Sequence, residues 1–322
     1  MRDVLVTENI VGSAMESLKG RFDVALEPEL WSTPERLQEL IVDFRAIIVR
    51  NQTRVTSELI ASAPHLQVIG RAGAGLDNID LDAATAAGIV VAYTPEQNAL
   101  SVAELAMGMM LALGRKIVLA DQTTKAGEWK RRESTGIELY GKTLGLVGLG
   151  RIGYRVGQRG KAFGMDIVAY DLYANPDAIP VSESFARMMD LNELLGMADF
   201  VSCHVPLTSE TVGLFDYERF CNMKSTAYFI NTSRGEVVNE AALVQALKEK
   251  RIAGAALDVR QKEPPDKGPL SEMDNVILTP HIGAFTREGQ ERVVSSVCRD
   301  VGAILEGGEA INYFNLSKPK RI

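Results

Sequence analysis

The chain contains little cysteine and no grouping of cysteines that predicts a metal site. Cys203, Cys221 and Cys298 are the three cysteines among 322 residues. Their odd number and irregular spacing fit neither a disulfide framework nor a zinc cluster. Because thiols stay reduced inside most cells, this usage favours a reducing compartment. We therefore expect a cytoplasmic protein without a bound metal.

Long apolar runs and an excess of positive charge are missing as well. The longest apolar region, residues 99–114, is interrupted by Glu104 and is shorter than the roughly 20 residues that span a bilayer. The opening stretch MRDVLVTENI carries Arg2, Asp3 and Glu8, which does not fit a signal peptide. A net charge of −7 argues against a nucleic-acid surface, which needs a basic face. Neither a membrane nor a nucleic acid is expected as a partner.

Two successive patterns of short β-rich runs, separated by helix-length amphipathic stretches, make up the chain. A length of 322 residues exceeds the roughly 250–300 residues at which a single core stops growing, so two domains are expected. Strands that alternate with helices predict parallel sheets covered on both faces. The expected fold class is therefore α/β with two doubly wound parallel sheets. The expected strands are 4–6, 22–26, 46–49, 67–70 and 89–93, then 143–148, 166–171, 199–203, 226–230, 253–259 and 275–279.

Two longer helices are expected where the two patterns meet. One covers residues 94–116, and the other runs from about Thr286 to Leu305. Because the second helix follows the last strand of the second pattern, it can return the chain to the first domain. The second domain would then be an insertion, and the N-terminal domain would form the other wall of a cleft.

The stretch TLGLVGLGRIG, residues 143–153, predicts a dinucleotide-binding turn. Gly148, Gly150 and Gly153 follow an apolar strand and precede a helical pattern, as this fingerprint requires. The three glycines permit a tight turn, a close approach of the backbone to the pyrophosphate, and close packing of helix on strand. A purely structural strand–turn–helix remains the alternative.

An acidic residue ends the next expected strand. Asp171 stands about 20 residues after the glycines, where it can accept hydrogen bonds from both hydroxyls of an adenine ribose. It would also repel a 2′-phosphate, and Leu172 and Tyr173 supply no arginine to compensate. NAD is therefore the expected cofactor, in preference to NADP.

Three histidines occur, so a histidine that moves a proton can be sought by elimination. His65 precedes a strand and is expected in a loop or at a helix cap. His204 ends an expected strand and either lines the cofactor or is merely packed. His281 follows the last strand, and the carboxyl ends of parallel strands face the ligand crevice of an open sheet. His281 is thus the candidate general acid and base.

Two further strand ends carry charged residues at the same expected edge. Arg234 lies in NTSRGE, while Asp258 and Glu263 follow AGAAL. An arginine can bind a carboxylate through two parallel hydrogen bonds. A carboxylate beside a histidine holds its tautomer and favours its charged form. Each residue alone is commonly a surface or turn residue, but together with His281 they predict an oxidoreductase site.

These motifs together resemble the D-isomer-specific 2-hydroxyacid dehydrogenase family over essentially the whole chain. The resemblance rests on GLGRIG, Asp171, NTSRGEVV, AALDV through KEPP, and HIGA, and the phosphoglycerate branch is the most similar through residues 70–85 and 141–153. It implies a Rossmann NAD-binding domain at 99–287, inserted into a flavodoxin-like substrate domain formed by 1–98 and 288–322. It also implies a homodimer formed largely through the NAD-binding domain, and a small 2-hydroxy or 2-keto acid as substrate.

The resemblance assigns roles to single positions. His281 becomes the proton donor and acceptor, Glu263 its carboxylate partner and Arg234 the substrate clamp. The expected cofactor contacts are Gly148, Gly150, Arg151, Ile152, Gly153, Asp171, His204, Val205, Pro206, Thr232, Ser233, Arg234, Asp258, His281, Gly283 and Ala284. The expected substrate contacts are Arg50, Asn51, Ala72, Gly73, Ala74, Gly75, Asn98 and Arg234. Closely spaced glycines in 71–75 can aim backbone N–H groups at an anion.

Several departures leave the substrate open. The phosphoglycerate branch commonly has threonine in place of Ala74 and serine in place of Asn51, and often serine in place of Phe285. Arg50 ends an expected strand and is predicted to bind a second anion of the substrate, unless it merely lies on the surface. The leading expectation is 3-phosphoglycerate, with sulfolactate or glyoxylate and hydroxypyruvate as alternatives.

Two other functions are alternatives to a hydroxy acid dehydrogenase. A formate dehydrogenase would have glutamine in place of Glu263, since it moves no proton. An NAD-sensing corepressor-like protein, which would bind the cofactor without turnover, is the non-enzymatic alternative. The chain is also expected to lack the C-terminal regulatory domain of longer members of the phosphoglycerate branch.

Overall fold

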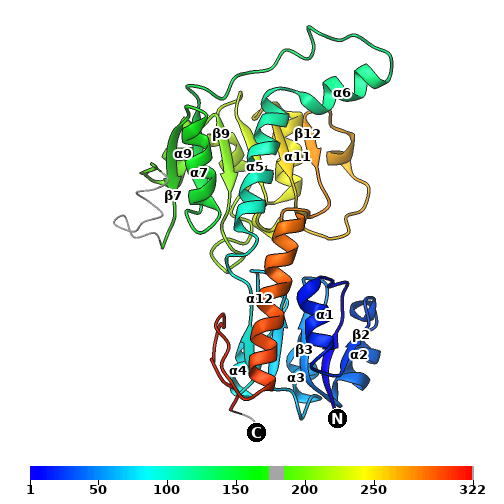
Figure 1. Ribbon diagram of the computed structural model, residues 1–322. Helices are drawn as coiled ribbons and strands as arrows, with labels where there is room; N and C mark the ends of the chain where they lie inside the picture. The colour runs from blue at the N-terminus through cyan, green and yellow to red at the C-terminus, as the bar shows by residue number, and fades with distance from the viewer. Residues whose placement is uncertain (174–184, 321–322) are drawn as a thin grey trace. The chain divides into compact units, whose positions relative to one another are not determined.

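Two parallel β-sheets, each in its own part of the chain, organise the computed structural model, which describes residues 1–173 and 185–320 (Figure 1). Residues 1–98 and 284–322 form the first unit, and residues 99–283 form the second. The expectation of two doubly wound parallel sheets is confirmed. The second boundary lies at 283/284, whereas the sequence placed it at 287/288. Ala284 and Phe285 therefore belong to the first unit.

The first unit contains a five-stranded sheet. Its strands are β1 (Arg2–Val6), β2 (Val24–Leu26), β3 (Phe44–Val49), β4 (Val68–Arg71) and β5 (Val90–Ala92). Their order is β2-β1-β3-β4-β5, and every neighbouring pair is parallel. This is the order of flavodoxin-like sheets.

Alternating side chains of these strands bury two apolar faces. Val4 and Val6 pack in the core shared with α1 (Ser13–Lys19) and α12 (Arg287–Leu305). Leu5 packs in the opposite core, which contains residues of α2 (Pro34–Ile41), α3 (Ser57–Ala61) and α4 (Leu81–Ala86). A Cβ on Gly70 would lie 2.6 Å from a methyl of Val301, so this glycine lets α12 lie directly on β4. The predicted helix at 286–305 thus returns to the first unit, with Thr286 capping it through Gly289 N–H at 2.9 Å.

The second unit contains a seven-stranded sheet. Its strands are β6 (Thr143–Val147), β7 (Asp166–Tyr170), β8 (Arg187–Met188), β9 (Phe200–Cys203), β10 (Tyr228–Asn231), β11 (Gly254–Leu257) and β12 (Val276–Leu278). The order is β12-β11-β10-β9-β6-β7-β8, and all pairings are parallel. Counted from β6, this is the Rossmann order with one strand added. The two-residue strand β8 was not expected from the sequence, because its residues carry no apolar run.

Helices cover both faces of this sheet. Residues of α5 (Ala99–Gly114) and α7 (Gly153–Ala162) pack in one core. Those of α9 (Leu191–Met197), α10 (Tyr217–Asn222) and α11 (Glu240–Lys248) pack in the other. α6 (Ile117–Lys125) buries none of its residues and projects away from the sheet of its unit (Figure 1). Among the described residues, no helix has the length and apolarity needed to cross a membrane.

The helix expected at 94–116 is shorter than predicted. Thr94 N–H donates to the carbonyl of Gly73 at 3.0 Å, which ties the segment before Ala99 to another loop. At the other end, Lys116 adopts φ 52° between α5 and α6. Within α5, the exposed Glu104 pairs with Arg159 of α7 at 3.3 Å, so the polar interruption faces outward.

Candidate active site

The glycine loop between β6 and α7 has the shape of a phosphate cradle. Gly148 has φ 96°, and a Cβ there would lie 2.8 Å from the carbonyl carbon of His204. A Cβ on Gly153 would lie 2.1 Å from the carbonyl oxygen of Gly148. A Cβ on Gly150, in contrast, would meet no described atom within 4 Å. Two glycines are therefore needed for packing, and the third leaves open space where a ligand can approach the backbone.

The first turn of α7 is open as well. Ile152 stands at its N-cap without a side-chain capping bond, so no side chain of the cap competes for the N–H groups there. A helix N-terminus of this kind attracts phosphate through its N–H groups and its partial positive charge. Arg151 is exposed in the same turn. The residues from Gly148 to Gly153 thus fit the pyrophosphate of a dinucleotide.

Asp171 lies beside this loop. Its Oδ2 accepts the N–H of Leu149 at 2.7 Å, and its Oδ1 accepts the N–H of Tyr173 at 2.8 Å. Each carboxylate oxygen retains further acceptor capacity. Leu172 and Tyr173 are 58% and 77% exposed, so neither closes over the carboxylate. The position and charge of Asp171 fit a ribose diol.

Two buried polar atoms at the carboxyl ends of β9 and β10 have no hydrogen-bond partner among the described residues. They are Nδ1 of His204 and Oγ1 of Thr232. Ser202 Oγ contacts the other ring nitrogen of His204 at 2.9 Å. Burial lowers the pKa of His204 to about 3, so the ring is neutral near pH 7. A bound molecule that supplies hydrogen-bond partners would relieve the cost of these two buried groups.

The central polar contact of the site joins the loop after β12 to the loop after β11. Nδ1 of His281 lies 2.7 Å from Oε2 of Glu263, and both side chains are about one-third exposed, at 33% and 31%. Burial acts to raise the pKa of Glu263, but the hydrogen bond and charge of His281, together with the charge of Arg234, hold it below its usual value. The pair brings together two of the three residues predicted to be catalytic. Because Glu263 occupies Nδ1, Nε2 is the nitrogen left to exchange a proton.

Asp258 holds the loop that carries His281. Its carboxylate accepts Thr279 Oγ1 at 2.6 Å, Ile282 N–H at 2.8 Å and Gly283 N–H at 2.8 Å. Its carbonyl accepts the N–H of His281 at 2.8 Å. His281 itself has φ 56°, a left-handed conformation that residues other than glycine adopt uncommonly. The sequence suggested Asp258 as a cofactor contact; the structure adds that it fixes the backbone of His281.

Arg234 is positioned by a buried asparagine that was not identified from the sequence. Asn231 Nδ2 donates to the carbonyl of Arg234 at 2.9 Å, and Asn231 Oδ1 accepts from the N–H and hydroxyl of Ser233 at 2.9 and 2.8 Å. The guanidinium of Arg234 donates to the Ser233 carbonyl at 2.8 Å. In the sequence, the only signal of this role of Asn231 was that a polar residue ends an otherwise apolar strand.

Other predicted cofactor positions lie at the same strand ends of the second unit. Val205 and the exposed Pro206 follow β9, and the Pro206 carbonyl accepts Thr211 Oγ1 at 2.6 Å. Ala284 lies just outside this unit, and its carbonyl accepts Gln290 Nε2 at 2.6 Å.

In the first unit, the loop after β3 is held by a buried carboxylate. Glu8 is 3% exposed and accepts the N–H groups of Arg50, Gln52 and Thr53 at 2.7, 3.2 and 3.0 Å, as well as Thr53 Oγ1 at 2.9 Å. Burial lowers the pKa of Arg50, and the charge of Glu8 opposes this shift. The guanidinium of Arg50 lies 4.7 Å from the ring centre of Phe285. Asn51, the neighbouring predicted contact, is exposed.

Two amides of the loop after β4 have partners within the protein. Gly73 N–H donates to the carbonyl of Arg71 at 2.8 Å, and Ala72 N–H donates to the carbonyl of Val49 at 2.8 Å. The expected substrate contacts of Ala72, Gly73, Ala74 and Gly75 stay predictions. Oδ1 of Asn98 is buried without a partner among the described residues.

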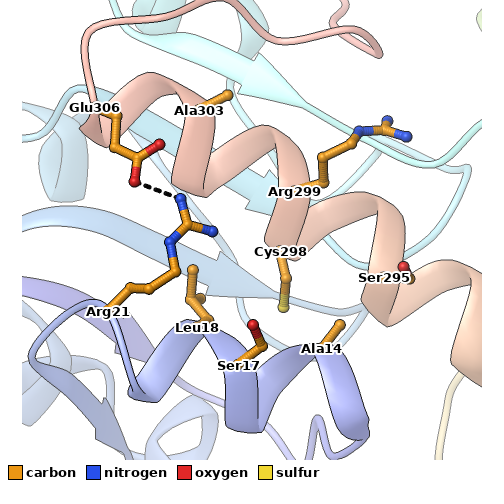
Figure 2. A pocket seen from close by; sticks show the side chains of 9 residues that line it. All are labelled: Ala14, Ser17, Leu18, Arg21, Ser295, Cys298, Arg299, Ala303 and Glu306. Carbon is orange, nitrogen blue, oxygen red and sulfur yellow. Dashed lines mark hydrogen bonds and ion pairs between the residues drawn. The ribbon is translucent and has the colours of Figure 1, made fainter.

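A groove of about 360 Å³ lies elsewhere in the first unit, between α1 and α12 (Figure 2). Arg21 faces Glu306 there at 2.5 Å. Arg299 pairs with Asp300 at 3.0 Å. Both cations are thus paired within the protein. None of the predicted site residues lines this groove.

Known proteins resemble this chain over much or nearly all of its length. Residues 107–283 match the model for the D-isomer specific 2-hydroxyacid dehydrogenase, NAD binding domain. D-3-phosphoglycerate dehydrogenase of Methanocaldococcus jannaschii is 45% identical over 98% of this chain, which spans 60% of that relative's length. A crystal structure of a Thermus thermophilus protein superposes with a TM-score of 0.90 at 36% identity, covering 97% of this chain and 99% of that one. A glyoxylate reductase from Paecilomyes thermophila superposes with a TM-score of 0.88 at 31% identity, covering 97% and 98%.

The matched region includes the glycine cradle, Asp171, Arg234, Glu263 and His281, which the structure places at strand ends of one sheet. The chain belongs to the D-isomer specific 2-hydroxyacid dehydrogenase family and carries that family's NAD-binding domain.

Proposed function

We propose that this protein is an NAD-dependent dehydrogenase of D-2-hydroxy acids. The observation that carries the proposal is the His281–Glu263 pair, 2.7 Å apart, in the unit that also holds the glycine cradle. A histidine that can move a proton and a site for a hydride acceptor are the two components that oxidation of a C–OH group needs.

His281 performs the proton transfer. In the oxidation direction, Nε2 of the neutral ring accepts the hydroxyl proton while the C2–H bond breaks. A bound NAD⁺ would supply the acceptor for the hydride that leaves C2, and the products would be a keto acid, NADH and a protonated His281. In the reduction direction, the charged ring returns the proton to the carbonyl oxygen. The carboxylate of Glu263 stabilises the charged ring and holds its orientation.

Arg234 binds the substrate carboxylate. A guanidinium offers two parallel donors to a carboxylate, which fixes the direction of the bond to C2. The charge of Arg234 contributes to the lowered pKa of Glu263, which supports its assignment beside the proton-transfer pair. We assign Ala74, Gly75 and Asn98 of the first unit to substrate binding as well.

NAD is the cofactor favoured over NADP. The carboxylate of Asp171, held by the N–H groups of Leu149 and Tyr173, suits the two hydroxyls of a ribose and repels a 2′-phosphate. Thr232 and His204, with their unpartnered buried atoms, line the same strand ends.

The substrate is a 2-hydroxy acid with a second anion, and 3-phosphoglycerate is the leading candidate. Arg50 supports this choice, since its guanidinium lies over the Phe285 ring, 4.7 Å from the ring centre, and an arginine there can donate hydrogen bonds to an anion. The names of relatives such as the M. jannaschii enzyme point to the same substrate. Sulfolactate would bring a sulfonate to the same place, and glyoxylate or hydroxypyruvate would bring no second charge.

A homodimer built on the second unit is also proposed. α6 buries no residue, and the apolar side chains of Ile117, Val118 and Trp129 are 51%, 38% and 78% exposed. An exposed apolar surface of this kind favours burial against another chain. Trp129→Glu should lower the mass measured by light scattering to that of a monomer, whereas an unchanged mass would remove this surface from the interface.

The three cysteines are free, which supports a reducing, cytoplasmic location.

The test is NADH oxidation with a panel of keto acids that end in phosphate, sulfonate, methyl and hydroxymethyl groups. We expect turnover, fastest with 3-phosphohydroxypyruvate. If a keto acid without a second charged group is turned over fastest, the proposed reaction stands but the proposed second anion of the substrate is wrong. Tight NADH binding without turnover of any keto acid would reject the enzyme and favour an NAD-sensing protein.

A further inference from the structure

Glu263 lies in an exposed loop, so its carboxylate needs a second anchor to stay beside His281. Gln261 and Lys262 are exposed, and Lys262 pairs with Asp266 across open surface at 2.7 Å. The Glu263 carboxylate has two bonds, Oε2 with His281 Nδ1 at 2.7 Å and Oε1 with Arg260 N–H at 3.1 Å. The main chain at Arg260 is therefore the second anchor of the pair.

A carboxylate from α11 holds that main chain. Glu240, the first residue of α11, accepts Arg260 Nε at 2.9 Å on Oε1 and Arg260 Nη2 at 2.8 Å on Oε2. Oε1 also accepts the N–H of Gln261 at 2.8 Å. The side chains of Arg260 and Glu240 are only 13% and 20% exposed. Two-point pairing with limited access to water is the arrangement in which an ion pair fixes geometry.

The same main chain packs directly on the loop of Arg234. A Cβ on Gly235 would lie 2.0 Å from both the carbonyl carbon and oxygen of Arg260 and 2.4 Å from the nitrogen of Gln261. No side chain fits between them, so the two loops touch backbone to backbone. Glu240 follows Gly235 by five positions and ties the same two loops together a second time.

We propose that Glu240, through Arg260, is a positioning residue for the acid–base pair: it fixes the Arg260 amide that holds Glu263 against Nδ1 of His281. The inference rests on the proposed function, because it gives His281 its role. Neither residue touches substrate or cofactor in this account. Glu240 acts through Glu263, and its loss should reproduce part of the loss of Glu263.

The first readout does not depend on turnover. The three histidines can be followed individually by NMR of protein labelled at the imidazole ring, and the Nδ1 signal of His281, which reports its hydrogen bond to Glu263, can be read for each variant. We expect Glu263→Gln to shift this signal and Glu240→Ala to shift it in the same direction by a smaller amount. Glu236→Gln is the matched control, since this exposed carboxylate lies on the same segment, four positions before Glu240.

The second readout is kinetic. Glu240→Ala should lower kcat by about tenfold, the smaller end of what is lost when a partner that orients a functional histidine is removed, with little change in KM for NADH. Arg260→Lys keeps the charge but not the two-point contact, so it should fall between Glu240→Ala and the unchanged protein. In a Glu263→Gln background, Glu240→Ala should add little, because its route of action is already gone.

The outcomes separate this inference from the proposed function. If Glu263→Gln moves the Nδ1 signal of His281 and Glu240→Ala does not, the positioning role is wrong and the proposed function stands. If Glu263→Gln itself leaves the signal unchanged, the acid–base pair is wrong and the inference falls with it. If the losses of kcat caused by Glu240→Ala and Glu263→Gln add fully in the double variant, Glu240 contributes to general stability and the proposal is overturned. Should Glu240→Ala fail to fold, Glu240→Gln and Arg260→Lys carry the same test.

Discussion

Oε2 of Glu263 lies 2.7 Å from Nδ1 of His281, and Oε1 of the same carboxylate accepts the N–H of Arg260 at 3.1 Å. One side chain thus joins the proposed proton carrier to a main-chain anchor. Burial acts to raise the pKa of Glu263, but His281, the Arg260 amide and the charge of Arg234 outweigh this effect and keep the pKa below its usual value. The carboxylate is therefore ionised throughout the neutral range.

Glu263→Gln should lower the rate of keto acid reduction. The proton donor in this direction is the charged ring of His281, which the neighbouring carboxylate stabilises and holds in place. Without that carboxylate, kcat should fall by about 10–100-fold, as when a partner that orients a functional histidine is removed, while the Kd for NADH stays unchanged. The acid side of the pH profile should not follow the protonation of Glu263, whose lowered pKa lies outside the neutral range. A kcat equal to that of the wild type would contradict the pairing.

Gly150→Ala and Gly153→Ala form a matched pair for the cradle. A Cβ at Gly150 meets nothing in the protein, so this variant should keep its Tm and lose NADH affinity. A Cβ at Gly153 would lie 2.1 Å from Gly148 O, so that variant should lose about 1–3 kcal/mol of folding stability, as overpacking does. Thermal unfolding and NADH fluorescence titration separate the two effects. Unchanged NADH binding in Gly150→Ala would remove the cradle from the cofactor site.

Asp171→Ala combined with Leu172→Arg should shift preference from NAD toward NADP. The double substitution removes a carboxylate that repels a 2′-phosphate and supplies a cation to attract it. The ratio of kcat/KM for the two cofactors measures the change, and Tyr173→Ala, which alters the neighbouring exposed side chain without adding charge, is the control. A wild-type protein that already prefers NADP would show this interpretation of Asp171 to be wrong.

Arg50→Ala should weaken the binding of a substrate with a second anion more than the binding of a substrate without one. The expected loss is about 1.5–3 kcal/mol for 3-phosphohydroxypyruvate, the range of a hydrogen bond to a charged group, and much less for pyruvate. Arg54→Ala is the control, since Arg54 is a nearby exposed arginine. Equal losses for both substrates, measured as kcat/KM, would exclude an anion site at Arg50.

The sequence predicted the sheets because buried parallel strands are short apolar runs. Val4 to Val6 and Leu144 to Val147 are examples, and both lie within the strands that were expected. The cradle was predictable for the same local reason, since three glycines and Asp171 lie within a short segment. The edge strand Arg187–Met188 was missed because it buries little.

Contacts between distant residues could not be predicted. Glu8 and Glu240 look like surface acids in the sequence, yet they accept hydrogen bonds from residues 42 and 20 positions away. Only the fold brings such partners together, and no local pattern encodes the pairing. The amide of Gly73 has a local partner instead, the carbonyl of Arg71, and its expected contact with an anion stays a prediction. The roles of the site residues themselves stay predictions.

The most direct test of the central claim is single-turnover oxidation of bound NADH by saturating 3-phosphohydroxypyruvate, compared between wild type and His281→Ala. The account predicts a rate lower by about 10²–10⁴ in the variant, the range for a lost general acid, with the Kd for NADH unchanged. His65→Ala, at an exposed loop position of the first unit, should keep the wild-type rate. A His281→Ala protein that oxidises NADH at the wild-type rate would contradict the account.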